Sequence, residues 1–200
     1  MRIGVAATPD VAIPTLNWLL QSGHEISVII TQPDRPAGRG RLLQQSVVAD
    51  WAQEHKIPLL KPESSNELIG KIEQLDLVLT IGYGVLLPES ILTLPKKGFL
   101  NLHFSLLPAY RGAAPAQRVL HNGETVTGVT VFQLDKGMDT GPIYLTHEVV
   151  LDSKAKSDEV LLALSDIAAA KTLECLELIH AQKEPYSQPI NGASIAPKFT

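Results

Sequence analysis

The chain has 200 residues, 44% of them apolar, and a formal net charge of −4. This length and apolar content are typical of one globular domain with a sizeable buried core. The charge excludes attraction of a nucleic acid by an overall positive field, so such a partner would need a local basic patch.

The N-terminal half alternates strands with helices. The apolar runs 2–7 and 26–31 predict buried strands, and the apolar period over 13–20 predicts a helix between them. We expect side chains of 8–10 to cap this helix and Gly23 to end it. The order predicts parallel strands with a right-handed crossover. The first turn, GVAATPD, lacks the G-x-G-x-x-G pattern, which argues against NAD or FAD, and no Walker A pattern is found.

Further short elements follow a polar loop at 32–45 that is rich in Pro and Gly. The patterns predict helices over 47–55, 65–75, 88–94 and 114–122, and strands over 57–60, 76–81 and 99–103. Ligands of open α/β sheets bind beyond the carboxyl ends of the strands, so the segments after 81 and 103 are of interest.

The C-terminal part does not continue the alternation of strands and helices. Strands are predicted over 126–133 and 143–150 with no helix between them, so we expect an antiparallel edge. A long helix over 157–179 follows, and the last twenty residues are polar and turn-like. The predicted fold class is therefore α/β, with an open, mostly parallel, doubly wound (Rossmann-like) sheet and an antiparallel C-terminal edge.

The chain has one cysteine and no long apolar segment. Cys175 lies in the predicted long helix, where we expect it to be a small buried apolar side chain. No run approaches the ~20 residues that span a bilayer, and the N-terminus lacks the apolar region of a signal peptide. We expect a reducing, cytoplasmic setting and no membrane partner.

The stretch 101–112, NLHFSLLPAYRG, carries the main candidate site. Asn101 and His103 lie two apart at a predicted strand end, so both point to one face of the sheet. An amide that can hold an oxygen then lies beside a group that can move a proton near neutral pH. Asp139, in the loop LDKGMDTGP, is the natural carboxylate partner. A strand end with a merely hydrogen-bonded His103 is the competing interpretation.

Asp135 shares this loop with Asp139, and we expect it to cap a turn. The histidines form no H-x-x-x-H or H-E-x-x-H pattern, so a catalytic metal is not predicted.

Three arginines, Arg35, Arg39 and Arg41, cluster in the loop at 32–45. Guanidinium groups on a Gly-rich loop can grip phosphates, although a solvated loop is the simpler interpretation of the composition.

Two turns could line a ligand pocket. The Gly-Tyr-Gly turn at 82–84, with the leucines that follow, could face a flat ligand or could be a plain tight turn. The turn at 105–108, SLLP, exposes main-chain polar groups, and the peptide before Pro108 could be cis or trans.

The motifs NLHFSLLPAYRG and GMDTGP together resemble the folate-dependent formyltransferases, which share an Asn-x-His … Asp catalytic set. The segments TPD, TQPDRPAGRG, SLLPAYRGAAPAQ and TGVTVFQLDKGMDTGPI are similar to the methionyl-tRNA formyltransferases in particular. The glycinamide ribonucleotide enzymes normally carry a Ser-Asn phosphate turn where this chain has TPD. The sugar-nucleotide enzymes share SLLP and RG but are not expected to keep the PDRPAGRG loop.

The resemblance implies transfer of a formyl group from 10-formyltetrahydrofolate to the α-amine of initiator methionyl-tRNA, without a metal. It implies three groups of site residues: catalytic Asn101, His103 and Asp139; folate-binding Gly82, Tyr83, Gly84, Val85, Leu86, Ser105, Leu106, Leu107 and Pro108; and tRNA-binding Arg35, Arg39 and Arg41. The alternative is a relative that acts on a small amine such as an amino-sugar nucleotide.

The resemblance also implies a domain division. We expect residues 1–183 to form the formyltransferase catalytic domain, and 184–200 to begin the linker to a C-terminal tRNA-binding β-barrel that this chain lacks. We further expect a monomer.

Overall fold

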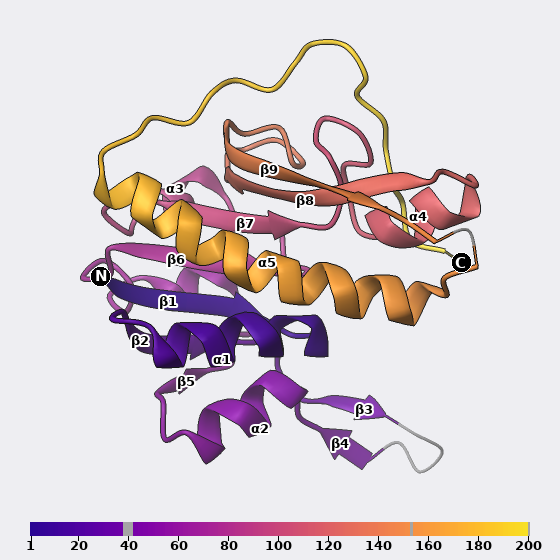
Figure 1. Cartoon of the computed structure of the whole chain (residues 1–200). Coiled ribbons are helices and arrows are strands. Elements are labelled where there is room, and N and C mark those ends of the chain that lie inside the picture. Colours follow the sequence, from indigo (N-terminus) through magenta and orange to yellow (C-terminus); the bar gives the residue numbers. More distant parts are fainter. Residues whose placement is uncertain (38–41, 153, 200) are drawn as a thin grey trace. The chain divides into compact units, whose positions relative to one another are not determined.

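The computed structural model describes residues 1–37, 42–152 and 154–199 (Figure 1). The chain divides into two compact units, Met1–Phe99 and Leu100–Thr200. The expected division at residue 183 stays a prediction. In the part of the chain that the structure describes, no helix is both long and apolar enough to cross a membrane.

The first unit is built on four parallel strands. They are β1 (Arg2–Ala7), β2 (Glu25–Ile30), β5 (Leu59–Leu60) and β6 (Leu77–Ile81), arranged in the order β5-β2-β1-β6. Every residue of β6 is buried, as its unbroken apolar run predicts for a central parallel strand. The predicted parallel arrangement is confirmed.

The helices of this unit after α1 are shorter than the sequence predicted. The helical segments of the unit are the 3₁₀ turn η1 (Asp10–Ala12), α1 (Ile13–Gln21), α2 (Val47–Glu54), the 3₁₀ turn η2 (Ser65–Leu68) and α3 (Glu89–Leu92). The predicted helix over 65–75 is wrong beyond its first turn. Gly70 has a φ of +80° and its amide donates to the Glu73 carboxylate, so the chain leaves the helical conformation there.

The predicted capping of the first helix is also wrong. No side chain caps α1, which begins through a 3₁₀ turn with Pro14 in its first turn. The Thr8 hydroxyl instead donates to the carbonyl of Tyr83 over 3.4 Å. Two short strands lie where the sequence predicted only a loop: β3 (Arg35–Ala37) pairs antiparallel with β4 (Leu42–Gln44).

The second unit contains the antiparallel edge that the sequence predicted. The strands β7 (Phe99–His103), β8 (Val126–Gln133) and β9 (Ile143–Val150) lie side by side in that order, and both pairs are antiparallel (Figure 1). Two helices, α4 (Pro115–His121) and α5 (Ser157–His180), complete the unit, and α5 packs against β8, β9 and α4. Cys175 of α5 is fully buried, and this burial raises the pKa of its thiol to about 12.

The segment after α5 has no helix or long strand, yet it is tied closely to the second unit. It forms one bridge between Tyr186 and Ile143 and another between Ile195 and Arg111. Its end reaches α4, where the Arg118 side chain donates to the carbonyls of Pro197 and Lys198. Figure 1 shows this segment as the long yellow trace.

Gly128 of β8 gives a test of the packing in this unit. A Cβ atom at Gly128 would lie 2.2 Å from the carbonyl oxygen of His147 and 2.5 Å from a methyl group of Leu106. Gly128→Ala is therefore expected to lower the free energy of unfolding by about 1–3 kcal/mol, measured by chemical denaturation. The control is Gly23→Ala, since nothing lies within 4 Å of its Cβ position. An equal effect of the two substitutions would contradict the packing described here.

Candidate active site

The strand β7 places Asn101 and His103 on one face of the sheet. The antiparallel register pairs Asn101 with Phe132 and His103 with Thr130. His103 is 5% exposed, and the edge of its ring meets Phe132 at 6.3 Å between centroids. The strand predicted at 99–103 thus ends with a buried imidazole, whose polar partners decide what it can do.

The hydrogen bonds of His103 define its tautomer. Its Nε2 lies 2.8 Å from the carbonyl oxygen of Tyr110, which can only accept, so Nε2 carries the hydrogen. In the neutral ring Nδ1 then holds the free lone pair. This Nδ1 lies 3.8 Å from Oδ2 of Asp139, within reach of a charge interaction but beyond a hydrogen bond. The structure therefore brings His103 and Asp139 together, and it makes Nδ1 the nitrogen that can exchange a proton.

The burial of His103 controls its charge state. Burial lowers the pKa of His103, and the Asp139 carboxylate and the bond to Tyr110 offset this only in part. Desolvation of the ring therefore has a larger effect on this pKa than the charge of Asp139, which acts in the opposite direction. At neutral pH the resting ring is neutral, and it is ready to accept a proton.

Tyr110 holds His103 through a main chain in the left-handed region, with a φ of +62°. Such a conformation costs about 1–2 kcal/mol in a non-glycine residue, so it persists only where neighbours determine it. Here the Tyr110 amide donates to the Ser194 hydroxyl over 2.8 Å, its phenol donates to Glu124, and Asn122 donates to the phenol oxygen. These contacts hold the carbonyl that orients the imidazole.

Asp139 lies in the loop between β8 and β9 and also has a positive φ, of +53°. Its Oδ2 accepts a hydrogen bond from the amide of Gly112 over 2.7 Å. Asp135 closes the same loop, because its Oδ1 accepts from the Gly137 amide and the Thr140 hydroxyl. The turn-capping role predicted for Asp135 is confirmed.

The segment 105–108 turns tightly after β7. The buried Ser105 hydroxyl donates to the carbonyl of Ala109 over 2.6 Å, and the Ser105 carbonyl accepts from Thr130. The Leu107-Pro108 peptide, which the sequence left open, is cis. The Ser105 hydroxyl thus serves the turn itself, and Leu107 is also buried.

The Gly-Tyr-Gly turn follows β6 in the first unit. Gly82 and Gly84 have φ values of +55° and +74°, and Gln32 donates to the carbonyl of Tyr83 over 2.6 Å. The Tyr83 side chain is buried, whereas Val85 and Leu86 are exposed. A cavity of about 240 Å³ adjoins the turn; its lining is Gln32, Pro33, Asp34, Arg35, Pro62, Glu63, Ser65, Tyr83 and Val85.

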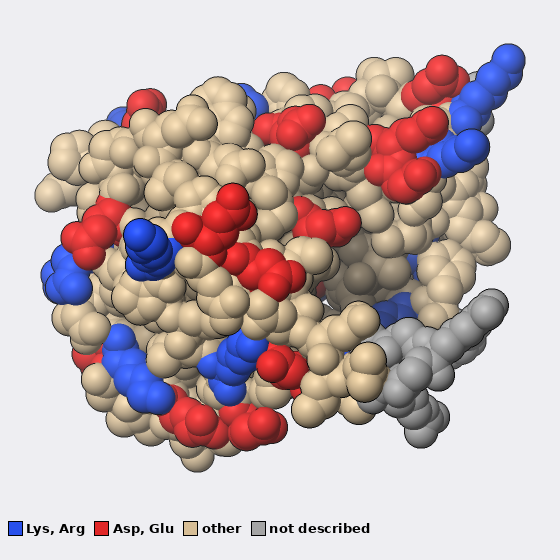
Figure 2. All heavy atoms as spheres, turned by 90° about the horizontal axis from the view of Figure 1, so that it is seen from below, with Lys and Arg blue, Asp and Glu red and all other residues tan. Residues whose placement is uncertain are grey.

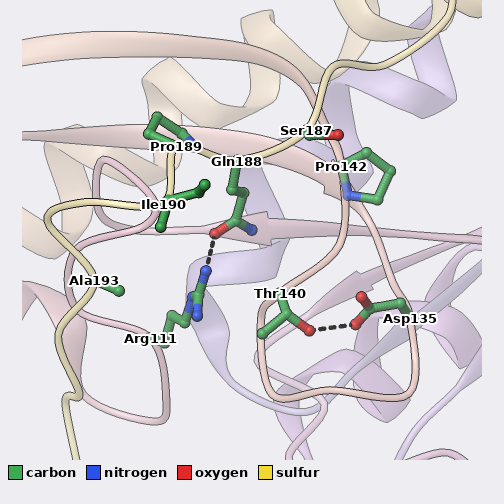
Figure 3. Close-up of a pocket in the computed structure, with 9 residues that line it drawn as sticks. All are labelled: Arg111, Asp135, Thr140, Pro142, Ser187, Gln188, Pro189, Ile190 and Ala193. Carbon is green, nitrogen blue, oxygen red and sulfur yellow. Dashed lines mark hydrogen bonds between the residues drawn. The ribbon is translucent and has the colours of Figure 1, made fainter.

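A larger cavity, of about 510 Å³, lies in the second unit beside the Asp139 loop (Figure 3). Arg111 and Gln188 line it and are joined by a hydrogen bond of 2.6 Å. Sequence reasoning missed Gln188 and Ser194, which lie in a polar segment without periodicity. Arg111 lies in the stretch 101–112, NLHFSLLPAYRG, but nothing in that pattern indicated its partner.

Of the three arginines predicted to meet RNA, Arg35 lies exposed at the start of β3, and Arg39 and Arg41 lie outside the described residues. Figure 2 shows basic and acidic side chains interspersed on the face it presents, without a broad area of one sign among the coloured residues. The described residues also contain no cluster of three or more His, Cys, Asp or Glu that could hold a metal ion.

Solved structures define the class of this fold. Phosphoribosylglycinamide formyltransferase from Bacillus halodurans matches with a TM-score of 0.76 and 22% identity, over 92% of this chain and 97% of that one. An N-formyltransferase from Helicobacter canadensis, in complex with folinic acid and dTDP-3-aminofucose, matches with a TM-score of 0.75 and 18% identity, over 99% and 71%. The fold is that of the formyltransferases.

The chain belongs to the formyl transferase family, whose model matches residues 1–173. It is 43% identical to the methionyl-tRNA formyltransferase of Salinispora tropica, over 100% of this chain and 67% of the relative. It is 39% identical to that of Streptomyces coelicolor, over 100% and 66%. The chain thus spans about two thirds of the length of these curated relatives.

Proposed function

We propose that this chain carries the catalytic machinery for transfer of a formyl group from 10-formyltetrahydrofolate to the α-amine of initiator methionyl-tRNA, at the start of protein synthesis. The observation that carries the proposal is the pair formed by buried His103, on the same strand face as Asn101, and half-buried Asp139, in a family of formyl transferases. Identities of about 40% to methionyl-tRNA formyltransferases support this acceptor over a small amine.

Asn101, His103 and Asp139 have distinct roles in this reaction. When bound, 10-formyltetrahydrofolate supplies the formyl carbon and a leaving nitrogen that must gain a proton. Neutral His103 takes the proton of the incoming amine at Nδ1 and later returns it to the leaving group, so no proton is gained or lost overall. Asp139 stabilises the imidazolium between these steps. The Asn101 amide donates to the formyl oxygen as negative charge develops there.

Two turns of the chain are the proposed folate contacts. In the first unit, Gly82 and Gly84 have positive φ values and carry no side chain, so a ligand can approach the main chain closely there. The exposed side chains of Val85 and Leu86 offer an apolar surface on which a flat ring can lie. A Cβ atom at Gly84 would lie 2.9 Å from Nε2 of Gln32, so a side chain there would crowd the turn. In the second unit, 105–108 forms the other proposed contact, mainly through its main chain.

Arg35, Arg39 and Arg41 are proposed to bind phosphates of the tRNA, and substitution of Arg35 tests this proposal. Phosphate contacts release counterions, so loss of one contact lowers the slope of log affinity against log salt by about 1. Arg35→Ala is expected to weaken binding of the charged tRNA in this way and to leave folate binding unchanged, measured by titration at several salt concentrations. Equal losses for tRNA and folate would count against an RNA contact.

The proposed function is tested by measuring formyl transfer from 10-formyltetrahydrofolate to charged initiator tRNA and to a panel of small amines that includes amino-sugar nucleotides. We expect product with the tRNA and none with the panel. Product with a small amine alone would move the chain to the alternative acceptor class.

A further inference from the structure

Gln188 links the segment after α5 to the loop that carries Asp139. Its Nε2 donates to the carbonyl oxygen of Asp139 over 2.9 Å and to that of Gly141 over 2.8 Å. Its Oε1 accepts from the guanidinium of Arg111 over 2.6 Å (Figure 3). The Gln188 side chain is therefore hydrogen-bonded to the main-chain carbonyls of the residues before and after Thr140.

The side-chain amide of Gln188 both donates and accepts in this set of bonds. A guanidinium can only donate and a carbonyl can only accept, so the oxygen and nitrogen of the Gln188 amide have one possible assignment. The main chain of Arg111 is itself restrained, because its amide donates to the Ser194 carbonyl and its carbonyl accepts from the Ala196 amide. The oxygen of the Gln188 amide is thus hydrogen-bonded to Arg111, and its nitrogen is hydrogen-bonded to the main chain of the Asp139 loop.

The Asp139 loop needs such a restraint. Asp139 has a φ of +53°, a conformation that persists in a non-glycine residue only where the surroundings determine it. The bond from Gly112 fixes its carboxylate, and the bonds from Gln188 fix its main chain. The carboxylate acts on His103 through charge across 3.8 Å, so a shift of the loop would change that interaction directly.

We propose that Gln188 is a positioning residue that holds the Asp139 carboxylate in place beside His103. The inference rests on the proposed function, since it gives Gln188 a part in the same reaction. Gln188 acts only through the Asp139 loop.

Gln188→Met and Gln188→Glu separate the bonds that Gln188 makes. Methionine has nearly the same length but makes none of these three hydrogen bonds. Glutamate keeps an acceptor for Arg111 but turns a carboxylate toward two carbonyl oxygens. We expect both substitutions to lower kcat about tenfold or more, because small misplacements of catalytic groups are costly. The matched control is Gln21→Met, at an exposed position in the last turn of α1, which is expected to keep the wild-type kcat.

A direct readout is the NMR titration of the His103 imidazole in the full chain, without substrates and well below the unfolding temperature of each variant. Asp139 is the charged neighbour that raises the pKa of His103. Its displacement in Gln188→Met is therefore expected to move the titration midpoint to lower pH. Gln188→Glu is assessed by kcat alone, because its added charge would itself affect the midpoint.

Each outcome decides the proposal. A lower midpoint in Gln188→Met with a lower kcat in both variants supports it. An unchanged midpoint overturns it, even if kcat or the unfolding temperature falls, because the role would then be structural. A wild-type kcat in Gln188→Glu also overturns it. If the wild-type chain formylates no acceptor, the proposed function fails, whereas the titration still shows whether Gln188 positions Asp139.

Discussion

His103→Ala is expected to lower kcat for formyl transfer by about 10²–10⁴-fold, the usual contribution of a positioned acid–base group. His103 is the buried group whose free lone pair, at Nδ1, faces the Asp139 carboxylate. Its removal leaves no group to take the proton of the attacking amine and return it to the leaving nitrogen. The measurement is single-turnover formylation of charged initiator tRNA at saturating folate, and a rate near that of the wild type would sink the assignment.

A pH profile strengthens this test, because the expected sign can be worked out. The reaction needs neutral His103 in the free enzyme, so kcat/KM should fall as the pH drops through the pKa of His103. Burial places this pKa below the ordinary value of about 6.5. Asp139→Asn removes the charge that raises the pKa, so the acid limb should move to still lower pH while kcat falls. His180→Ala, at an exposed position at the end of α5, is the control and should leave the limb unchanged.

Much of this site could be predicted because its residues lie in regular elements. The spacing of Asn101 and His103 in β7 places both on one face by the alternation of a strand, and β8 and β9 have the clear patterns of strands. Asp139 could be proposed because a Gly-rich loop between two strands must turn tightly. These predictions needed only local sequence patterns: the period of the strands and the glycines of the loop.

The remaining features depend on contacts that no local pattern records. Tyr110 adopts a positive φ because Ser194, more than eighty residues further along the chain, receives its amide hydrogen. Gln188 lies in a polar segment that resembles any surface loop. The charge of His103 depends on how completely its neighbours exclude water, which spacing does not report. Likewise, 65–75 has the composition of a helix, but a positive φ at Gly70 ends it after one turn.

Asn101→Ala is expected to lower kcat by about 10²–10³-fold, which corresponds to roughly 2.7–4 kcal/mol for one donor aimed at a developing negative charge. The amide donates most strongly once charge has formed on the formyl oxygen, so the affinity for the folate in the ground state should change little. Parallel measurement of kcat and of the folate dissociation constant checks this. A loss confined to folate affinity would show that Asn101 only binds the ground state.

Asn101→Asp gives a second, independent readout, because the side chain keeps its shape while it loses its donor. The new carboxylate would lie on the same face of β7 as His103, about 7 Å along the strand. It should raise the pKa of His103 and move the acid limb of kcat/KM to higher pH, the opposite of the shift expected for Asp139→Asn. Asn66→Asp, exposed in η2, controls for the added charge. Shifts of the same sign in both site variants would mean that Asn101 and Asp139 do not act on one imidazole.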